Sequence, residues 1–131
     1  MENKHKELCT RILGLDRSIR FAGLVDHLGS LLATAYREGL TPLASREETE
    51  KFASQAVYMT GALGVGLSSR IGKVQYVVGR YENLFRATVP VITDRYDKFY
   101  LMLSFDVGTD VVSTVEGKVI PFIEANKADL A

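Results

Sequence analysis

An uncharged run inside a predicted long helix constrains the fold more than any other feature of this sequence. From Phe52 to Ser69 (FASQAVYMTGALGVGLSS) the chain carries no Asp, Glu, Lys or Arg. The helix is expected to begin at a capping box, because Ser45 and Glu48 can each bind a backbone N–H that a helix start leaves unpaired. Gly72, directly after Ile71, predicts its end, since glycine tolerates the left-handed turn that closes many helices.

This helix is expected to be covered on two sides, because a helix that packs on one side only normally keeps charges on the other. One apolar stripe contains Phe52, Ala56, Met59, Leu63 and Leu67. A second set lies off that stripe and contains Tyr58, Ala62 and Val65. The sequence therefore predicts that a second copy of the chain, or a partner, covers the side formed by the second set.

Length and composition are those of an ordinary globular protein and predict a single domain over 1–131. The chain has 131 residues, 47% hydrophobic and 24% charged, and its 16 basic and 16 acidic side chains balance to a net charge of zero. A nucleic-acid partner is not expected, since such proteins usually show a basic excess or stripe.

Membrane insertion and secretion are not expected either. Ser54, Gln55 and Thr60 interrupt the uncharged run, so it does not predict a membrane span. The charged N-terminus shows no apolar signal region. A single cysteine, Cys9, excludes an intramolecular disulfide and favours a reducing cytoplasm.

Hydrophobic periodicity and turn residues predict an α+β fold with the element order α-ββ-α-βββ-α. The terminal helices are expected at Glu2–Leu13 and Thr109–Asn126, the second with a kink at Pro121 because proline supplies no N–H. Five strands are expected, at Ile19–Val25, Ser30–Tyr36, Val74–Tyr81, Leu84–Ile92 and Phe99–Phe105.

The strands are expected to form one five-stranded antiparallel sheet with helices on both faces. Phe99–Phe105 (FYLMLSF) is apolar at both alternating sets of positions, as expected of a central strand covered on both sides. The predicted strand order is second, first, fifth, fourth, third. The long helix should lie on one face of the sheet and the two terminal helices on the other.

Two segments carry a resemblance to known families. Ala22–Ala33 (AGLVDHLGSLLA) resembles the first hairpin of the roadblock/LC7 family, a branch of the profilin-like α/β sandwiches, and the uncharged helix followed by Val74–Tyr81 resembles its dimerising helix and edge strand. Ile19–Gly23 and Gly39–Leu43 also resemble a set of small uncharacterised archaeal proteins. The roadblock resemblance implies a non-enzymatic homodimer that regulates or scaffolds a small GTPase, or a motor light chain.

The predicted dimer interface combines the outer side of the long helix with the third strand. Val74–Tyr81 holds one charge before its turn, so as an edge strand it would expose backbone groups that can pair with another chain. Tyr58, Ala62, Val65 and Tyr76 are expected near the contact.

Exposed Arg and Tyr side chains are common anchors of protein contacts, and two predicted hairpin turns hold them. Tyr81 and Arg86 flank one turn, while Arg95 and Tyr96 lie in the next. These four residues are the predicted partner contacts. The alternative is two solvated loops with cross-strand ion pairs of little energetic value.

No motif identifies a reaction. Gly61-x-x-Gly64-x-Gly66 lacks the Lys and Ser/Thr of a phosphate loop and follows no strand, so close packing is the expected role of these glycines. His5, His27 and Cys9 are too few and too scattered in the sequence to predict a metal site or an activated nucleophile. The sequence thus predicts no cofactor, no metal and no enzyme.

Three functions remain open at this stage. The first is a homodimeric regulatory or scaffold domain, acting on a small GTPase or another signalling protein. The second is a profilin/PAS-like sensor that binds a small molecule between sheet and helix, which would need a roomy pocket. The third is an enzyme of undetected class, which would need converging polar groups with shifted pKa values.

Overall fold

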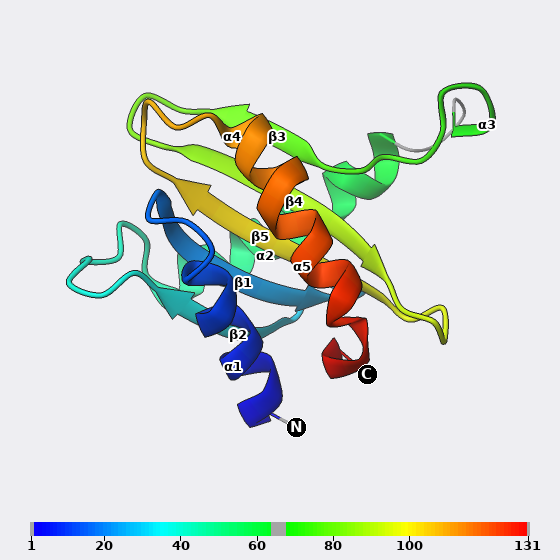
Figure 1. Ribbon diagram of the computed structural model, residues 1–131, viewed down its shortest axis with the longest axis horizontal. Coiled ribbons are helices and arrows are strands. Elements are labelled where there is room, and N and C mark those ends of the chain that lie inside the picture. Colours follow the sequence, from blue (N-terminus) through cyan, green and yellow to red (C-terminus); the bar gives the residue numbers. More distant parts are fainter. Residues whose placement is uncertain (1, 64–67, 131) are drawn as a thin grey trace.

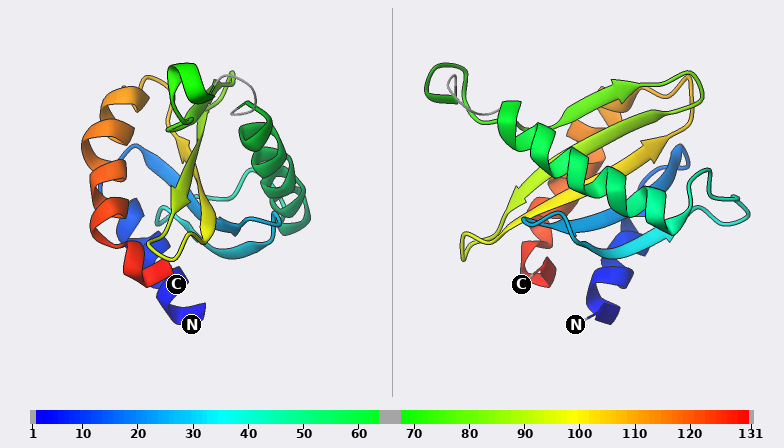
Figure 2. Two further views of the ribbon diagram at one scale, coloured as in Figure 1. Left: turned by 90° about the vertical axis from the view of Figure 1, so that its right-hand side faces the viewer. Right: turned by 180° about the vertical axis from the view of Figure 1, so that it is seen from behind.

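One antiparallel sheet forms the centre of the molecule, and helices cover both of its faces (Figures 1 and 2). The computed structural model describes residues 2–63 and 68–130. The helices are α1 (Glu2–Leu13), α2 (Arg46–Leu63), α3 (Ser68–Ile71), α4 (Val111–Thr114) and α5 (Ile120–Ala125), with a π-helical turn at Val115–Val119 and a 3-10 turn at Lys127–Leu130. The strands are β1 (Ile19–Asp26), β2 (Leu31–Tyr36), β3 (Val77–Arg80), β4 (Phe85–Ile92) and β5 (Lys98–Phe105).

The strand order is β2-β1-β5-β4-β3, which confirms the order expected from the sequence. The central strand β5 is apolar on both faces, as predicted. Tyr100 and Met102 belong to the core cluster beneath α2, while Leu101, Leu103 and Phe105 belong to the cluster beneath the terminal helices. Two-sided burial therefore explains why FYLMLSF lacks the usual alternation of apolar and polar residues.

Figure 2 shows α2 alone on one face of the sheet, with α1 and the C-terminal helix together on the other. This layering confirms the predicted placement of the helices. The larger core lies beneath the terminal helices and includes the fully buried Leu8, Ile12 and Val115. The smaller core beneath α2 consists of Phe21, Val25, Ala53, Ala56, Tyr100 and Met102, with partly buried neighbours.

The start of α2 forms the predicted capping box. The Ser45 N–H donates to Glu48 Oε1 at 2.9 Å, and the Glu48 N–H donates to Ser45 Oγ at 3.1 Å. Each side chain thereby binds one of the amide groups that a helix start leaves unpaired.

The sequence predicted one helix that reaches Ile71. The structure describes α2 to Leu63 and α3 at Ser68–Ile71, and the predicted continuation through 64–67 lies outside the described residues. Glycine costs about 1 kcal/mol relative to alanine inside a helix, and three glycines lie in this stretch. Of these, Gly64 and Gly66 lie outside the described residues, as do Val65 and Leu67.

Within the described residues, no neighbouring element packs closely on Gly61, in contrast to the expectation from the sequence. A Cβ added at Gly61 would meet no heavy atom of the described residues within 4 Å. The absence of a side chain at this position therefore leaves open space on the helix surface.

Strand β3 is shorter than predicted. It comprises Val77–Arg80 and pairs with the first half of β4, from Phe85 to Thr88. Before Val77 the chain leaves the ladder, and the Tyr76 hydroxyl donates to Glu116 Oε2 on the C-terminal helix. The edge of the sheet thus offers a shorter strand than the predicted Val74–Tyr81.

The disturbance predicted at Pro121 takes the form of a widened turn. Pro121 lies in the first turn of α5 and follows the π-helical turn Val115–Val119. Because proline has no N–H, the carbonyl of Gly117 cannot receive the usual i→i−4 hydrogen bond. A π-helical turn of this kind lets the helix continue past the missing donor.

The β1–β2 hairpin turn contacts α2. Asp26 Oδ1 accepts hydrogen bonds from the Leu28 and Ser30 N–H groups, both at 2.9 Å. Gly29 has a φ of +86°, and a Cβ added there would lie 3.0 Å from Ser54 Cα. The turn therefore needs glycine both for its conformation and for its approach to the helix.

Candidate interaction surfaces

The outer face of α2 is apolar and exposed. Tyr58 is 79% exposed and Met59 62% exposed, and Ala62 is exposed beside them. The sequence placed Met59 in one apolar stripe with Phe52 and Ala56, but its side chain does not share their burial. The residues that α2 turns toward the sheet are smaller: Thr49, Ala53, Ala56 and Thr60 are buried.

The sheet explains why α2 turns its small residues inward and leaves Met59 exposed. The aromatic rings of Phe21 and Tyr100, together with Met102, fill the space beneath α2, so that alanine-sized side chains suffice on the helix. A helix can approach a sheet that carries large side chains most closely when the helix residues at the contact are small. Met59 is thereby left on the side facing solvent, next to Tyr58.

The predicted dimer-interface residues fall into three groups. Tyr58 and Ala62 share the outer face of α2. Tyr76 packs against the core beneath the terminal helices, so it belongs to the opposite face of the sheet, and its hydrogen bond to Glu116 raises the pKa of the Tyr76 hydroxyl. Val65 lies outside the described residues. Their joint role at an interface stays a prediction.

The predicted partner contacts separate into two pairs at opposite ends of β4. Tyr81 and Arg86 lie at the β3–β4 turn, whereas Arg95 and Tyr96 lie in the β4–β5 turn. Tyr96 is 87% exposed and has a φ of +67°, uncommon for a bulky residue. The structure therefore does not bring the four residues together into one surface.

Arg86 is the most unusual of the four. Its guanidinium carbon lies 3.7 Å from the centre of the Phe52 ring and 5.6 Å from that of Tyr81. Burial lowers the pKa of Arg86, and no carboxylate of the described residues contributes to that pKa. A half-buried guanidinium that stacks on aromatic rings without a counter-charge is a candidate contact for an anionic group.

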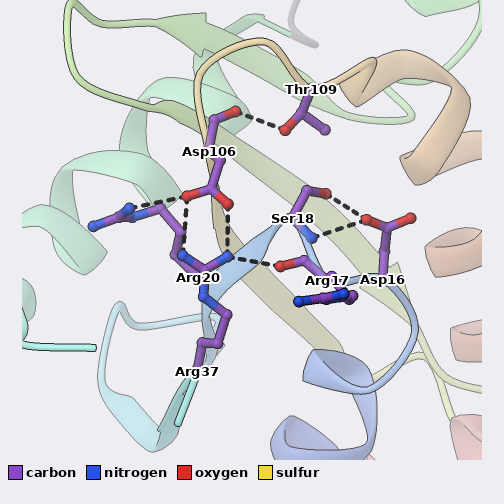
Figure 3. A network of polar contacts seen from close by, with 7 residues as sticks. All are labelled: Asp16, Arg17, Ser18, Arg20, Arg37, Asp106 and Thr109. Atoms are coloured by element: carbon purple, nitrogen blue, oxygen red, sulfur yellow. Dashed lines mark hydrogen bonds and ion pairs between the residues drawn. The ribbon is translucent and has the colours of Figure 1, made fainter. Parts of the chain in front are cut away.

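A polar network occupies the same end of the sheet (Figure 3). Asp106 follows β5 and accepts hydrogen bonds from Arg37 at 2.6 and 3.0 Å and from Arg20 at 3.0 Å. Arg37 also donates to the Arg17 carbonyl at 2.6 Å. The hydrogen bond from Arg37 and that from Arg20 hold the pKa of Asp106 below its usual range.

The network was not foreseen from the sequence. Arg20 lies at the start of β1, Arg37 follows β2 and Asp106 follows β5. The three residues meet because the start of β1 lies beside the ends of both β2 and β5 in the antiparallel sheet. The pairing of β1 with β5 shifts register between Ile19 and Phe21, which places Arg20 in a bulge. Bulges commonly redirect a side chain, and this one lies at the strand end next to Asp106.

A second ion pair fastens the C-terminal helix to the start of β1. Lys118 Nζ lies 2.8 Å from Asp16 Oδ2, and the Ser18 hydroxyl and N–H both donate to Asp16 Oδ1. These hydrogen bonds, that from Lys118 foremost, lower the pKa of Asp16. Thr109 Oγ1 donates to the Asp106 carbonyl at 2.7 Å (Figure 3), and the Asp106 N–H donates to the Ser18 carbonyl at 2.9 Å, which joins the two groups of contacts.

Next to Arg86 a small pocket opens between the start of α2, the segment 37–44 and the sheet. Its volume is about 60 Å³, and its walls include Phe21, Tyr36, Leu43 and Phe52. Sites for small-molecule ligands usually measure roughly 300–1,000 Å³. Two broader hollows of about 420 and 430 Å³ are open to solvent, one beside Asp16 and the other beside Thr60.

The side chains considered for catalysis lie apart. Cys9 is buried, and burial raises the pKa of its thiol to about 11, which is opposite to what an activated thiolate needs. His27 is exposed in a turn, and His5 Nε2 lies 3.3 Å from the Leu130 carbonyl oxygen. Within residues 2–63 and 68–130, no three His, Cys, Asp or Glu side chains are grouped as metal ligands. No helix in the same ranges is long and apolar enough to cross a membrane.

Comparison with solved structures identifies the fold as roadblock/LC7-like. A roadblock/LC7 domain from Streptomyces avermitilis superimposes with a TM-score of 0.66 at 14% identity, covering 96% of this chain and 98% of that one. The gliding protein MglB from Thermus thermophilus gives a TM-score of 0.70 at 19% identity, with 99% and 87% covered. Myxococcus xanthus MglB gives 0.65 at 21% identity, with 98% and 86% covered.

The resemblance noted in the sequence is thus confirmed at the level of the fold. No family model matches the sequence. No curated protein is detectably similar to it in sequence.

Proposed function

We propose that the protein is a non-catalytic regulatory or scaffold domain that works as a homodimer and binds a small GTPase or a similar signalling protein. The observation that carries the proposal is the outer face of α2. Two large side chains, Tyr58 and Met59, are exposed there on a helix segment without charges. Monomeric proteins seldom leave apolar side chains grouped on a surface unless a partner covers them.

The open edge of the sheet supports the dimer. β3 is the last strand on its side of the sheet, and such a strand presents unpaired backbone groups to other chains. Pairing of β3 with its two-fold mate would continue the sheet and bring the two α2 helices together. Such a contact uses the same surface on both copies, so the assembly is complete as a dimer.

The partner class comes from the roadblock resemblance, whose members regulate or scaffold small GTPases. The fold shared with MglB, described in one structure as a gliding protein, is consistent with a regulatory role. Surface arginine and tyrosine side chains supply contact points of the kind that anchor protein interfaces. The free, buried thiol of Cys9 is consistent with a reducing, cytoplasmic setting.

A binding measurement tests this function. The purified chain is immobilised, and small GTPases from the same genome are applied, each loaded either with GDP or with a non-hydrolysable GTP analogue. We expect one GTPase to bind with a dissociation constant of about 10 µM or tighter in one nucleotide state, and about tenfold more weakly in the other, a difference of ~1.4 kcal/mol. A folded, dimeric preparation that binds none of them in either state would contradict the proposal.

A further inference from the structure

The small pocket beside Arg86 combines apolar walls with a positive charge. Strand pairing aligns four residues in one row on the α2 face of the sheet: Tyr36 pairs with Phe21, Phe21 with Ser104, and Ser104 with Arg86. All four line the pocket. The row therefore runs from two aromatic rings, over a serine hydroxyl, to a guanidinium.

The charges around the pocket are unbalanced. Arg20 and Arg86 are the charged side chains that line it, and Arg20 is already paired with Asp106 at 3.0 Å. Within the described part of the chain, neither the Arg86 guanidinium nor the Ser104 hydroxyl forms a side-chain hydrogen bond. Arg86 is half-buried and stacks on Phe52, so its position is set by packing and not by an acidic partner. An arriving carboxylate would find a fixed, partly desolvated donor.

Two exposed side chains with apolar surface lie at and near the pocket. Leu43 lines it and is 69% exposed, and Tyr81 is 49% exposed, with its ring centre 5.6 Å from the guanidinium carbon of Arg86. A pocket of about 60 Å³ admits the end of one side chain, and it is smaller than the cavity of roughly 150 Å³ that accommodates benzene. A free small carboxylate would leave Leu43 and Tyr81 uncovered, whereas a peptide segment would cover them.

From these features we infer that the pocket receives a glutamate or aspartate side chain of a partner protein, flanked by aliphatic residues that cover Leu43 and Tyr81. The carboxylate would lie between Arg86 and Ser104. The inference rests on the proposed function, since it specifies the chemistry of the segment that the partner presents.

The test uses a peptide probe and nuclear magnetic resonance. The full chain, labelled with ¹⁵N, is titrated with acetyl-Ser-Leu-Glu-Leu-Ser-amide and, separately, with the same peptide carrying glutamine in place of glutamate. We expect the glutamate peptide to shift the Arg86 side-chain signal and the amides of Ser104 and Phe52. The glutamine peptide should bind at least about tenfold more weakly, because it lacks the charge that pairs with the guanidinium.

Two variants and one control locate the effect. Arg86→Gln should abolish the preference for glutamate over glutamine. Leu43→Ser, at a position too exposed to support the fold, should weaken the glutamate peptide severalfold while keeping that preference. Arg95→Gln removes an exposed arginine from the opposite end of β4 and should leave the titration unchanged. Thermal unfolding of each variant checks that it is folded.

The outcomes separate this inference from the proposed function. Equal binding of both peptides, or an unchanged titration with folded Arg86→Gln or with Leu43→Ser, would overturn the pocket assignment even if a small GTPase binds. Binding of the glutamate peptide with the expected variant pattern would support the pocket even if no GTPase binds. Signals that shift only around Arg95 would also overturn it.

Discussion

At the scale of single residues, two glycines with similar backbone angles have different surroundings. Gly29 has a φ of +86° and Gly39 a φ of +78°, both in the left-handed region that disfavours other residues. A Cβ at Gly29 would lie 3.0 Å from Ser54 Cα, whereas a Cβ at Gly39 would meet no heavy atom of the described residues within 4 Å. Substitutions at these two glycines therefore distinguish the energetic cost of backbone strain from that of a steric clash.

Gly29→Ala should lower the free energy of unfolding by about 2–3 kcal/mol, and Gly39→Ala by about 1 kcal/mol, because only the first substitution adds a clash to the strain. Urea unfolding followed by circular dichroism measures both values. Equal losses of unfolding free energy in the two variants would show that the close contact between Gly29 and α2 does not restrict the residue at position 29.

Asp106 links three strand ends, and its substitution should change the acid sensitivity of the protein. Arg37 and Arg20 hold its pKa below that of the unfolded chain, so its contribution to stability is present above about pH 4 and is lost as the pH falls through the folded-state pKa. Asp106→Asn should cost about 1 kcal/mol at pH 7, a modest value because the side chain is 38% exposed to screening by solvent.

The measurement is unfolding at several pH values between 7 and 3. The loss of stability on acidification should be smaller in Asp106→Asn than in the parent protein. Asp94→Asn, at an exposed position in the β4–β5 turn, is the matched control and should follow the parent curve. Superimposable curves for the parent and Asp106→Asn would mean that the network adds nothing to stability.

At the scale of elements, helix α2 depends on its first turn. The Ser45–Glu48 capping box binds two N–H groups at the start of the helix, and both of its side chains are exposed. Ser45→Ala should lower the free energy of unfolding by about 1 kcal/mol. Gln55→Ala, an exposed substitution inside the same helix, should change it by less than about 0.5 kcal/mol. Thermal unfolding of both variants tests this expectation, and equal effects would contradict it.

The sequence predicted the elements well where a local signal was strong. The capping box placed the start of α2, and the two-sided apolarity of Phe99–Phe105 placed β5 at the centre of the sheet. The exposure of Met59 was not predictable in the same way. It depends on what packs against the helix, because the large side chains of β1 and β5 meet Ala53 and Ala56 of α2, with the partly buried Phe52 and Val57 beside them.

The candidate site was predictable only in part. Tyr81 and Arg86 were recognised as residues of one turn, and the structure places them together with Phe52. The network of Asp106 with Arg20 and Arg37 had no signal in the sequence, because it depends on strand order and on a bulge. Residues that are far apart in the chain meet there only after the sheet has formed.

At the scale of the whole molecule, the proposed dimer leads to a direct prediction. Ala62→Glu places a charge on the outer face of α2 and should raise the dimer dissociation constant at least about tenfold, because an unpaired charge would be buried in the contact. Val112→Glu, on the exposed side of the C-terminal helix, is the control and should not change the dissociation constant. Light scattering at micromolar concentration measures both. A monomeric parent protein would rule out the dimer itself.

The two edges of the sheet are not equivalent, and this difference limits how the chain can polymerise. Along β2, a side chain of α1 already binds the backbone, since Lys6 donates to the Thr34 carbonyl. At the other edge, within the described residues, the four residues Val77–Arg80 extend the ladder beyond β4. Growth of a fibre by strand pairing would use both edges and would displace Lys6 from Thr34, whereas a two-fold contact through β3 leaves that hydrogen bond in place.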